Sequence, residues 1–208
     1  FVFSSQDEDA LNKYYGEHPW LALDYPCRKT KEQLSSLYGV NGIPSLVLVD
    51  TDGSTISTEG RGAVSKDPTG AEFPWYPKPV ADLEDGPGNL NEAAVVVALC
   101  ECAGEEAQKA AEAAMTPLAK ASMDEAKAKG EETPELSFMI SKEDGGIGQQ
   151  IRKMTGLDGA KAAPKLIIIN IPDDGAFYLG PDGEITEAVV QKFAQDFKAG
   201  SLERKQLE

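Results

Sequence analysis

The side chains best suited to chemistry in this sequence are three thiols, those of Cys27, Cys100 and Cys102. A thiolate can attack a disulfide, but turnover needs a second thiol to resolve the mixed disulfide. No Cys-x-x-Cys pair occurs in the 208 residues. Cys100 and Cys102 alternate on one face of a strand, with Cα atoms near or beyond the ~7 Å limit for a disulfide. The odd cysteine count indicates a reducing compartment, and we expect the cytoplasm, the nucleus or another such compartment.

Of the three thiols, Cys102 has the expected position that most favours reactivity. It comes just before a predicted helix that begins at Gly104, where the helix dipole lowers a thiol pKa. This position makes Cys102 a candidate monothiol site. Glu105 stands where the second cysteine of a pair would be, so a degenerate, inactive site is the alternative. Cys27 precedes two basic residues but has no partner in sequence, and we expect it to be a spectator.

The sequence lacks the ligand sets of the usual metal centres. His18 is the only histidine, so a zinc site of Cys/His type cannot be assembled. Residues 50–53 read Asp-Thr-Asp-Gly, but the ligand spacing and the final Glu of a calcium loop are wrong, which predicts a hairpin turn. We therefore expect no metal and no bound cofactor.

Charge and hydropathy exclude two further classes of protein, those that bind nucleic acid and those that span a membrane. The formal net charge is −15, with 35 acidic and 20 basic residues and no local basic cluster, so nucleic acid would be repelled. The longest apolar run, over 93–100, is far shorter than the ~20 residues that span a bilayer, so we expect no membrane span.

The elements that must position these residues follow two patterns: strands in short apolar runs between turns, and helices with a 3.6-residue period. Ser5 is the expected N-cap of the first helix, because Glu8 stands in capping-box spacing. In the first half we expect a strand over 1–5, a helix over 6–15, an extended segment over 20–23, a helix over 29–38, a strand over 45–49, its hairpin partner over 54–58 and a short helix within 62–73.

Residues 79–91 are rich in Pro, Gly and acid, which predicts a linker between a first domain over 1–78 and a second over 92–208. The second half has a complete β-α-β-α-β-β-α order, and its long helix contains Pro117, a possible break. Its elements are a strand over 93–100, a helix over 104–129, a strand over 136–140, a helix over 147–154, a strand over 165–169, its hairpin partner over 176–179 and a helix over 186–199.

Both halves place a proline before the third strand of this plan, at Pro44 and at Pro164. A βαβαββα unit with such a proline resembles the thioredoxin fold, in which the strand order is fourth, third, first, second. The resemblance implies an α/β protein with two tandem thioredoxin-like domains, each a mixed sheet flanked by helices. The first half shows the same plan without its opening strand and helix, so we expect a domain truncated at its N-terminus.

Three segments narrow the resemblance to the tryparedoxins and nucleoredoxins. The run YYGEHPWLAL at 14–23, the run LYGVNGIP at 37–44 and the run EFPWYPKP at 72–79 resemble three segments of their catalytic domain. The closing stretch over 184–197 is similar to the nucleoredoxin end. The Trp-Cys-Pro-Pro-Cys motif of that family does not occur here, and we expect it in a segment before Phe1.

The resemblance implies a substrate groove in the first domain. Ile43 and Pro44 would form one wall, and Trp20 could border it, although core packing is the alternative for this tryptophan. Arg61 could face the same groove or simply be solvated. Ala163 and Pro164 would form the corresponding cis-proline position of the second domain, which we expect to be inactive in redox chemistry.

The leading interpretation is a thiol–disulfide oxidoreductase, a protein-disulfide reductase of the nucleoredoxin type with its active cysteines upstream. By resemblance, its partners would be disulfide-containing proteins and its electrons would come from a thiol and NADPH system; the second domain could bind a partner protein. A non-catalytic binding or structural subunit is the alternative, and a chaperone-like relative of the disulfide isomerases is a third.

Overall fold

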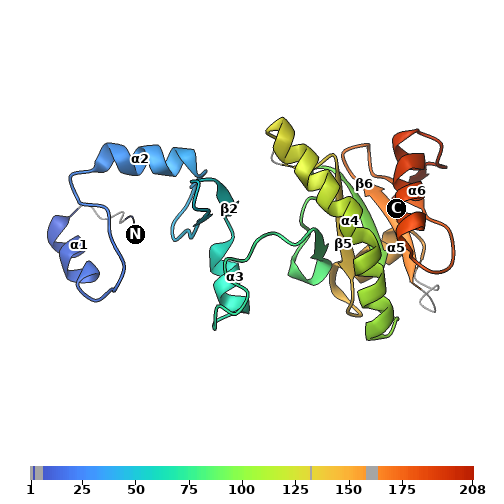
Figure 1. The fold of residues 1–208 in the computed structure, drawn as a ribbon, viewed down its shortest axis with the longest axis horizontal. Coiled ribbons are helices and arrows are strands. Elements are labelled where there is room, and N and C mark those ends of the chain that lie inside the picture. Colours follow the sequence, from blue (N-terminus) through green and yellow to red (C-terminus); the bar gives the residue numbers. More distant parts are fainter. Residues whose placement is uncertain (1, 3–6, 132, 158–163) are drawn as a thin grey trace. The chain divides into compact units, whose positions relative to one another are not determined.

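The computed structural model describes residue 2 and residues 7–131, 133–157 and 164–208. It divides the chain into two compact units, Phe1–Pro77 and Lys78–Glu208 (Figure 1). Among the residues described, no helix is long and apolar enough to cross a membrane.

Unit 1 consists of short elements joined by long loops. Asp7 caps the first helix, because its side chain accepts a hydrogen bond from the Asp9 N–H at 3.0 Å, so Ser5 is not the N-cap. The strand expected over 1–5 falls on residues that, apart from Val2, lie outside the described part. The elements are α1 (Glu8–Tyr15), α2 (Arg28–Leu37), β1 (Leu48–Val49), β2 (Thr55–Ser57) and α3 (Gly60–Lys66), with β1 and β2 paired antiparallel.

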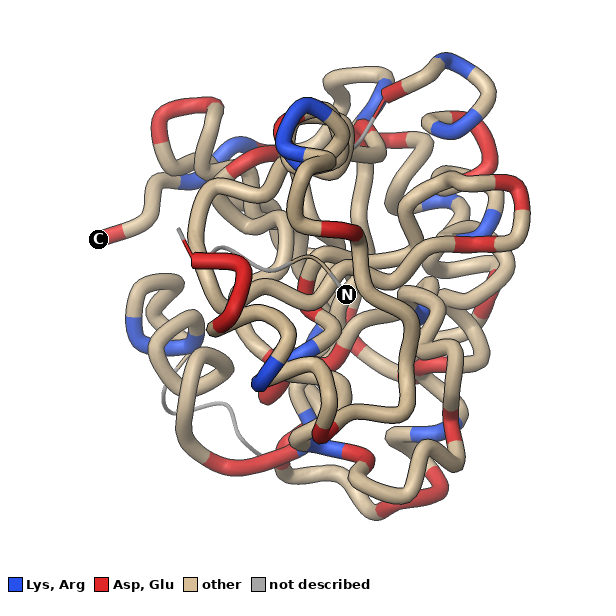
Figure 2. The backbone as a smooth tube through the Cα atoms, turned by 90° about the vertical axis from the view of Figure 1, so that its left-hand side faces the viewer, with Lys and Arg blue, Asp and Glu red and all other residues tan. Residues whose placement is uncertain are grey.

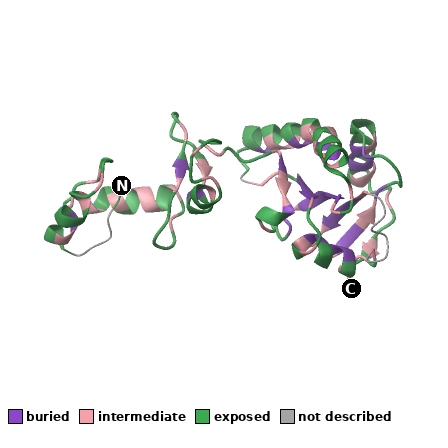
Figure 3. Cartoon of the chain, turned by 90° about the horizontal axis from the view of Figure 1, so that it is seen from below, coloured by how far each residue is buried: buried purple, intermediate pink, exposed green. Residues whose placement is uncertain are grey.

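Unit 1 buries little of its apolar surface. Leu11 and Leu48 are its only buried hydrophobic side chains among the residues described. Figure 3 shows the contrast with unit 2, where buried residues follow the strands. The exposed large hydrophobic side chains in the described part of the chain all belong to unit 1: Val2, Tyr14, Trp20, Leu21, Leu37, Ile43, Leu46, Val49, Val64, Phe73 and Tyr76.

Unit 2 is built on a mixed sheet of six strands in the order β3-β5-β4-β6-β7-β8. β4 runs parallel to β5 and antiparallel to β6, which pairs antiparallel with β7. The order β7-β6-β4-β5 is the order fourth, third, first, second that the thioredoxin resemblance predicts. The strands are β3 (Val80–Asp82), β4 (Ala94–Leu99), β5 (Leu136–Ser141), β6 (Lys165–Asn170), β7 (Ala176–Leu179) and β8 (Lys205–Gln206).

Helices cover the two faces of this sheet unequally. One face packs against α4 (Glu105–Lys129) and α6 (Glu187–Lys198), which contact each other. The opposite face packs against α5 (Gly146–Met154) and the short 3₁₀ helix η1 (Leu83–Asp85). The central strand β4 is completely buried along its length because it contributes side chains to both faces.

The linker predicted over 79–91 is wrong. This segment contains β3 and η1, and its residues Val80, Leu83 and Leu90 are almost completely buried. The segment is rich in turn-forming residues, but these three buried side chains anchor it on the sheet of unit 2. The boundary therefore falls at Pro77 and Lys78, and the second domain begins there rather than at residue 92.

The possible break at Pro117 does not occur either. α4 continues through this residue as a single helix of 25 residues and ends at Gly130, which adopts the left-handed conformation with φ of 71°. Pro117 is exposed, so its ring points away from the sheet. Buried residues on the other side of the helix, Ala111, Met115 and Ala119, hold both halves of α4 against the sheet.

Candidate functional site

The loop between α2 and β1 presents the Ile43–Pro44 dipeptide to solvent. The Ile43 side chain is 74% exposed, and the peptide bond to Pro44 is cis, the isomer that the resemblance implies. The Ser45 hydroxyl donates a hydrogen bond to the Gly42 carbonyl at 2.5 Å. Within the described part of the chain, Ile43 makes no backbone–backbone hydrogen bond, so its N–H and C=O are available to another extended strand.

α3 holds an arginine beside this loop. The Gly60 N–H donates to the Leu46 carbonyl at 3.1 Å, and a Cβ at position 60 would lie only 2.7 Å from that oxygen. Only glycine allows this close approach of the helix to the loop. As a result Arg61 reaches back, and its Nη1 donates to the Pro44 carbonyl at 3.4 Å. Arg61 therefore faces the proline loop.

Polar contacts of two tyrosines fix the β1–β2 hairpin beneath the loop. The Tyr76 hydroxyl donates to Asp50 at 2.9 Å, and the Tyr38 hydroxyl to the Gly53 carbonyl at 3.5 Å. The backbone N–H of Thr51 and the Tyr76 hydroxyl both lower the pKa of Asp50. The same bond to Asp50 raises the pKa of Tyr76, because it stabilises the protonated phenol.

Asp67 organises the end of unit 1, a role that no motif or spacing in the sequence indicates. Its carboxylate accepts hydrogen bonds from the Glu72 N–H at 2.8 Å, the Trp75 indole Nε1 at 3.0 Å and the Thr69 hydroxyl at 2.9 Å. These donors, led by the Glu72 N–H, hold the pKa of Asp67 far below its usual range. Asp67 thereby ties down the segment that carries the EFPW motif.

The structure does not bring Trp20 to the proline loop. Its ring lies 4.7 Å from the His18 ring, which in turn lies 4.5 Å from the ring of Tyr14 on α1. The Trp20 loop joins α1 to the N-terminus of α2, whereas Ile43 and Pro44 follow the C-terminus of α2 (Figure 1). Of the residues predicted to line a groove, the structure thus brings together the proline loop and Arg61.

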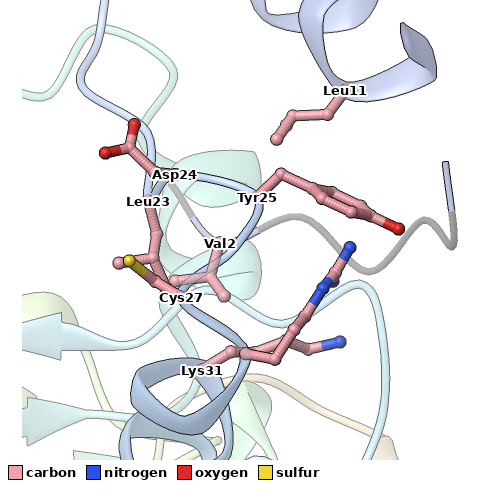
Figure 4. A pocket seen from close by; sticks show the side chains of 8 residues that line it. Val2, Leu11, Leu23, Asp24, Tyr25, Cys27 and Lys31 are labelled. Carbon is pink, nitrogen blue, oxygen red and sulfur yellow. The ribbon is translucent and has the colours of Figure 1, made fainter. Parts of the chain in front are cut away.

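Cys27 lies at the N-terminus of α2 beside a pocket of about 10 Å³, which holds at most one water molecule. Leu11 and Leu23 form part of its apolar lining, and Arg28 stacks on the Tyr25 ring at 3.8 Å. Figure 4 shows the Cys27 Sγ and the Lys31 amino group pointing to opposite sides. This arrangement fits the spectator role expected of Cys27.

The other two thiols occupy the turn between β4 and α4 in unit 2. Cys102 is exposed and Cys100 is buried, and neither forms a disulfide. Burial, and secondly the charge of Glu101, raise the pKa of the Cys100 thiol to about 11, so it stays protonated at neutral pH. Glu105, in the position of a second cysteine, pairs instead with Lys109 on α4. Cys102 therefore has no resolving thiol beside it in the described structure.

A buried ion pair below this turn is absent from the sequence-based predictions. Arg152 on α5 donates through Nε to Glu101, and both side chains are inaccessible to solvent. The Arg152 Nη2 also donates to the Leu99 carbonyl at 3.3 Å. Helical periodicity is compatible with a buried Arg152, since it stands four residues after the buried Gly148, but nothing in sequence pointed to Glu101 as its partner.

The second proline position lies at the edge of what the structure describes. Pro164 is half-buried and directly precedes β6. Ala163 lies outside the described residues, as does the rest of 158–163. The predicted cis bond between Ala163 and Pro164 therefore stays a prediction.

Comparisons with known proteins agree with this architecture. Residues 1–55 match the family described as thioredoxin-like. Human nucleoredoxin is 34% identical over 203 residues, which are 97% of this chain and 46% of that protein. Zebrafish (Danio rerio) nucleoredoxin is 36% identical over 97% of this chain and 47% of its own length. The chain thus spans about half the length of these curated relatives.

Tryparedoxins match a shorter stretch. Tryparedoxin of Trypanosoma brucei brucei is 42% identical over 71 residues, 34% of this chain and 49% of that protein. A solved structure of tryparedoxin from Trypanosoma brucei is 40% identical and covers 35% of this chain and 51% of that chain, with a TM-score of 0.33. The family match and the strand order of unit 2 place the chain in the thioredoxin-like class of proteins. Within that class, the chain is similar to the nucleoredoxins along 97% of its own length.

Proposed function

We propose that this chain is part of a thiol–disulfide oxidoreductase, a protein-disulfide reductase whose reactive cysteine pair lies in a segment before Phe1. The similarity to nucleoredoxins supports the reaction class. The observation that carries the proposal is that Ile43 is exposed and that its backbone N–H and C=O have no backbone partner in the described structure. An extended substrate segment could pair with this backbone and so bring its disulfide to the cysteine pair.

The reaction proceeds by two successive thiol exchanges. One cysteine thiolate attacks a sulfur of the substrate disulfide, forming a mixed disulfide and releasing the other substrate sulfur as a thiolate, which takes up a proton. The second cysteine, as thiolate, then attacks the mixed disulfide and releases the second substrate thiol. The enzyme pair is left oxidised, and an external dithiol restores it, ultimately at the expense of NADPH. These two exchanges require a reducing compartment and disulfide-containing protein substrates.

Unit 2 plays a different part in the proposal. Its turn carries one exposed thiol, Cys102, while Cys100 is buried and protonated and Glu105 replaces the second cysteine. We assign to it the role of a redox-inactive module that binds a partner protein. The same observations favour the alternative for the whole chain, a non-catalytic thioredoxin-fold subunit of a larger assembly.

The decisive experiment extends the chain towards its N-terminus. The natural protein should be expressed with the roughly 30 residues that precede Phe1, the length of one βαβ unit, and both forms assayed for reduction of a protein disulfide. We expect activity only in the extended form, and its loss when the added cysteine pair is changed to serine. Activity of residues 1–208 alone, or an extension without a cysteine pair, would overturn the proposal.

Variants in the extended form test the role of the proline loop. Ile43→Glu places a charge where the substrate chain would pair, and we expect kcat/KM to fall about tenfold, the size of a typical hot-spot effect. Thr55→Glu adds the same charge to the exposed face of β2 and is the matched control, with kcat/KM unchanged. Equal effects of the two substitutions would mean that charge, rather than the loop, is responsible.

A further inference from the structure

The sheet of unit 2 is covered unevenly, and this leaves a groove. On one face, α4 and α6 together contribute long stretches of helix. On the other, α5 has nine residues and η1 has three. The connection from β3 to β4 is η1 and a loop, so among the residues that the structure describes no second helix lies beside α5 on that face. The space beside α5 is only partly filled.

The groove beside α5, here called the α5 groove, has a volume of about 180 Å³. One stripe of the helix lines it at the spacing i, i+3, i+4 and i+7, namely Ile147, Gln150, Ile151 and Met154. Pro87, Leu90 and Asn91 of the β3–β4 connection, with Ile169 and Ile171 at the end of β6, complete the lining.

These walls favour an apolar side chain with polar groups at its ends. Seven of the nine lining residues are apolar, and the other two, Gln150 and Asn91, are exposed amides at the rim. An apolar cavity of ~150 Å³ holds benzene, so the α5 groove is large enough for the side chain of a phenylalanine or a leucine. The rim amides could hydrogen bond to the backbone of the segment that carries it.

The end of the groove near the start of α5 is acidic. A Cβ added at Gly146, the first residue of α5, would lie 3.1 Å from the Glu84 carboxylate, which also accepts a hydrogen bond from the Glu143 backbone N–H. Burial, and then the charges of Asp82 and Glu143, raise the pKa of Glu84. Glu84 and Glu143 are both exposed and come three and four residues before the groove residues Pro87 and Ile147. An incoming cation would relieve this repulsion.

We propose that the α5 groove binds a peptide segment of a partner protein that carries a large apolar side chain flanked by Lys or Arg. The apolar side chain enters between α5 and the β3–β4 connection, and the cations lie against Glu84 and Glu143. A second copy of this chain, with its net charge of −15, is disfavoured as the occupant, as are the anionic surfaces of nucleic acid and acidic lipids. Figure 2 shows how acidic residues recur along the backbone.

The test uses the 1–208 chain and three synthetic peptides of equal length. The first combines Leu with Lys, the second replaces each Lys by Glu, and the third replaces each Leu by Ser. Binding is followed by fluorescence anisotropy, and the site is located by NMR of Ile and Met methyl groups. We expect only the Leu/Lys peptide to bind, with weaker binding at high salt and with shifts at Ile147, Ile171 and Met154 rather than at Ile43 of unit 1.

Two kinds of variant separate shape from charge. Gln150→Trp fills the groove from its exposed rim without removing a core contact, and we expect at least tenfold weaker binding, as for other buried anchors. The double change Glu84→Gln and Glu143→Gln should weaken binding by about two- to fivefold for each exposed charge. Glu106→Gln, on the exposed start of α4, is the matched control and should leave affinity unchanged.

Each alternative occupant gives a different result. Equal binding of the Leu/Glu peptide would overturn the charge argument, and full binding by Gln150→Trp would show that the peptide sits elsewhere. Concentration-dependent dimerisation that Gln150→Trp abolishes would identify a second copy as the occupant. If no peptide shifts the groove methyl groups, the proposal is wrong.

Discussion

At the scale of single residues, the feature with the largest desolvation cost is the ion pair of Glu101 and Arg152. Both side chains are excluded from solvent, although each carries a charge that water would stabilise strongly. Removing two such charges from water costs several kcal/mol per ion, and only close pairing offsets that cost. The pair joins the end of β4 to α5, and the Arg152 bond to the Leu99 carbonyl adds a third point of attachment. These two residues therefore fix the turn that carries Cys102.

Removing one partner of this ion pair should destabilise unit 2 strongly. Arg152→Ala leaves Glu101 charged and buried without a partner, and we expect the free energy of unfolding in urea to fall by about 3–5 kcal/mol. Replacing both residues, with Glu101→Leu and Arg152→Met, should restore most of the loss, because no unpaired charge remains. A double variant as unstable as Arg152→Ala would show that packing rather than charge is limiting.

The Cys100 thiol predicts a loss of stability in alkali. Its pKa is raised from 9.0 to about 11 in the folded chain. Above pH 9 the unfolded chain therefore releases this proton while the folded chain keeps it, so the free energy of unfolding falls between about pH 9 and pH 11, by about 2–3 kcal/mol in all. Urea unfolding at pH 8 and pH 11 should show a smaller loss for Cys100→Ala than for the unchanged chain. Equal losses would mean that the thiol ionises as easily in the folded state.

At the scale of elements, α4 shows how tertiary packing overrides a local signal. A proline inside a helix removes one hydrogen bond and clashes with the preceding turn, which costs about 3 kcal/mol. α4 nevertheless runs through Pro117, because Met115 and Ala119 on its inner side are fully packed against the sheet. The helix is thus held together by its contacts rather than by its own propensity.

Replacing this proline should therefore stabilise unit 2. Pro117→Ala restores the N–H that bonds to the carbonyl of Ala113 and removes an exposed ring without opening a cavity. We expect the free energy of unfolding to rise by about 1–3 kcal/mol, less than the full cost of proline because the unfolded chain also becomes more flexible. Lys120→Ala, on the exposed side of the same helix, serves as the control and should change little. Unchanged stability of Pro117→Ala would indicate that the helix has already adapted to the ring.

The elements of unit 2 could be predicted from sequence, because apolar runs such as 93–100 and 165–169 are long and bounded by turns. β3 could not be predicted from sequence, because its three residues are too few to show the two-residue strand period and they lie among Pro, Gly and acidic residues. The motif over 37–44 predicts the loop of Ile43 and Pro44, whereas for Arg61 the sequence leaves open whether it faces this loop or is solvated. The partnerships of Asp67 and of Glu101 with Arg152 depend on contacts between distant segments, which no local pattern carries.

At the scale of the whole molecule, the two units differ in how much of their own apolar surface they bury. Unit 2 has a six-stranded sheet with both faces packed, whereas the described part of unit 1 has a two-stranded hairpin and eleven exposed large hydrophobic side chains. A lone hairpin is marginally stable at best in water. The described part of unit 1 therefore leaves apolar surface that further contacts can cover.

Amide hydrogen exchange of the 1–208 chain should show this difference directly. We expect slow exchange for β4, β5 and β6 at the centre of the sheet and fast exchange over residues 8–66. Limited proteolysis should agree, with the first cuts in unit 1 and a stable fragment that begins near Lys78. Strong protection across residues 8–66, or a first cut between Val80 and Leu90, would contradict the division.

The buried strand β4 has a consequence for how the gene can change in length. Val95, Val97 and Leu99 face one cluster, and Val96, Ala98 and Cys100 face the other, so deleting one residue would exchange the two faces. The exchange would bring Val and Leu side chains to where Ala98 and Cys100 now pack, which would disturb both clusters. Glu101 is a second obstacle, since such a deletion would pull it away from Arg152 and into the sheet. Insertions and deletions should therefore be excluded from β4 and its turn by the apolar core and the salt bridge together, and be admitted in the loop before it.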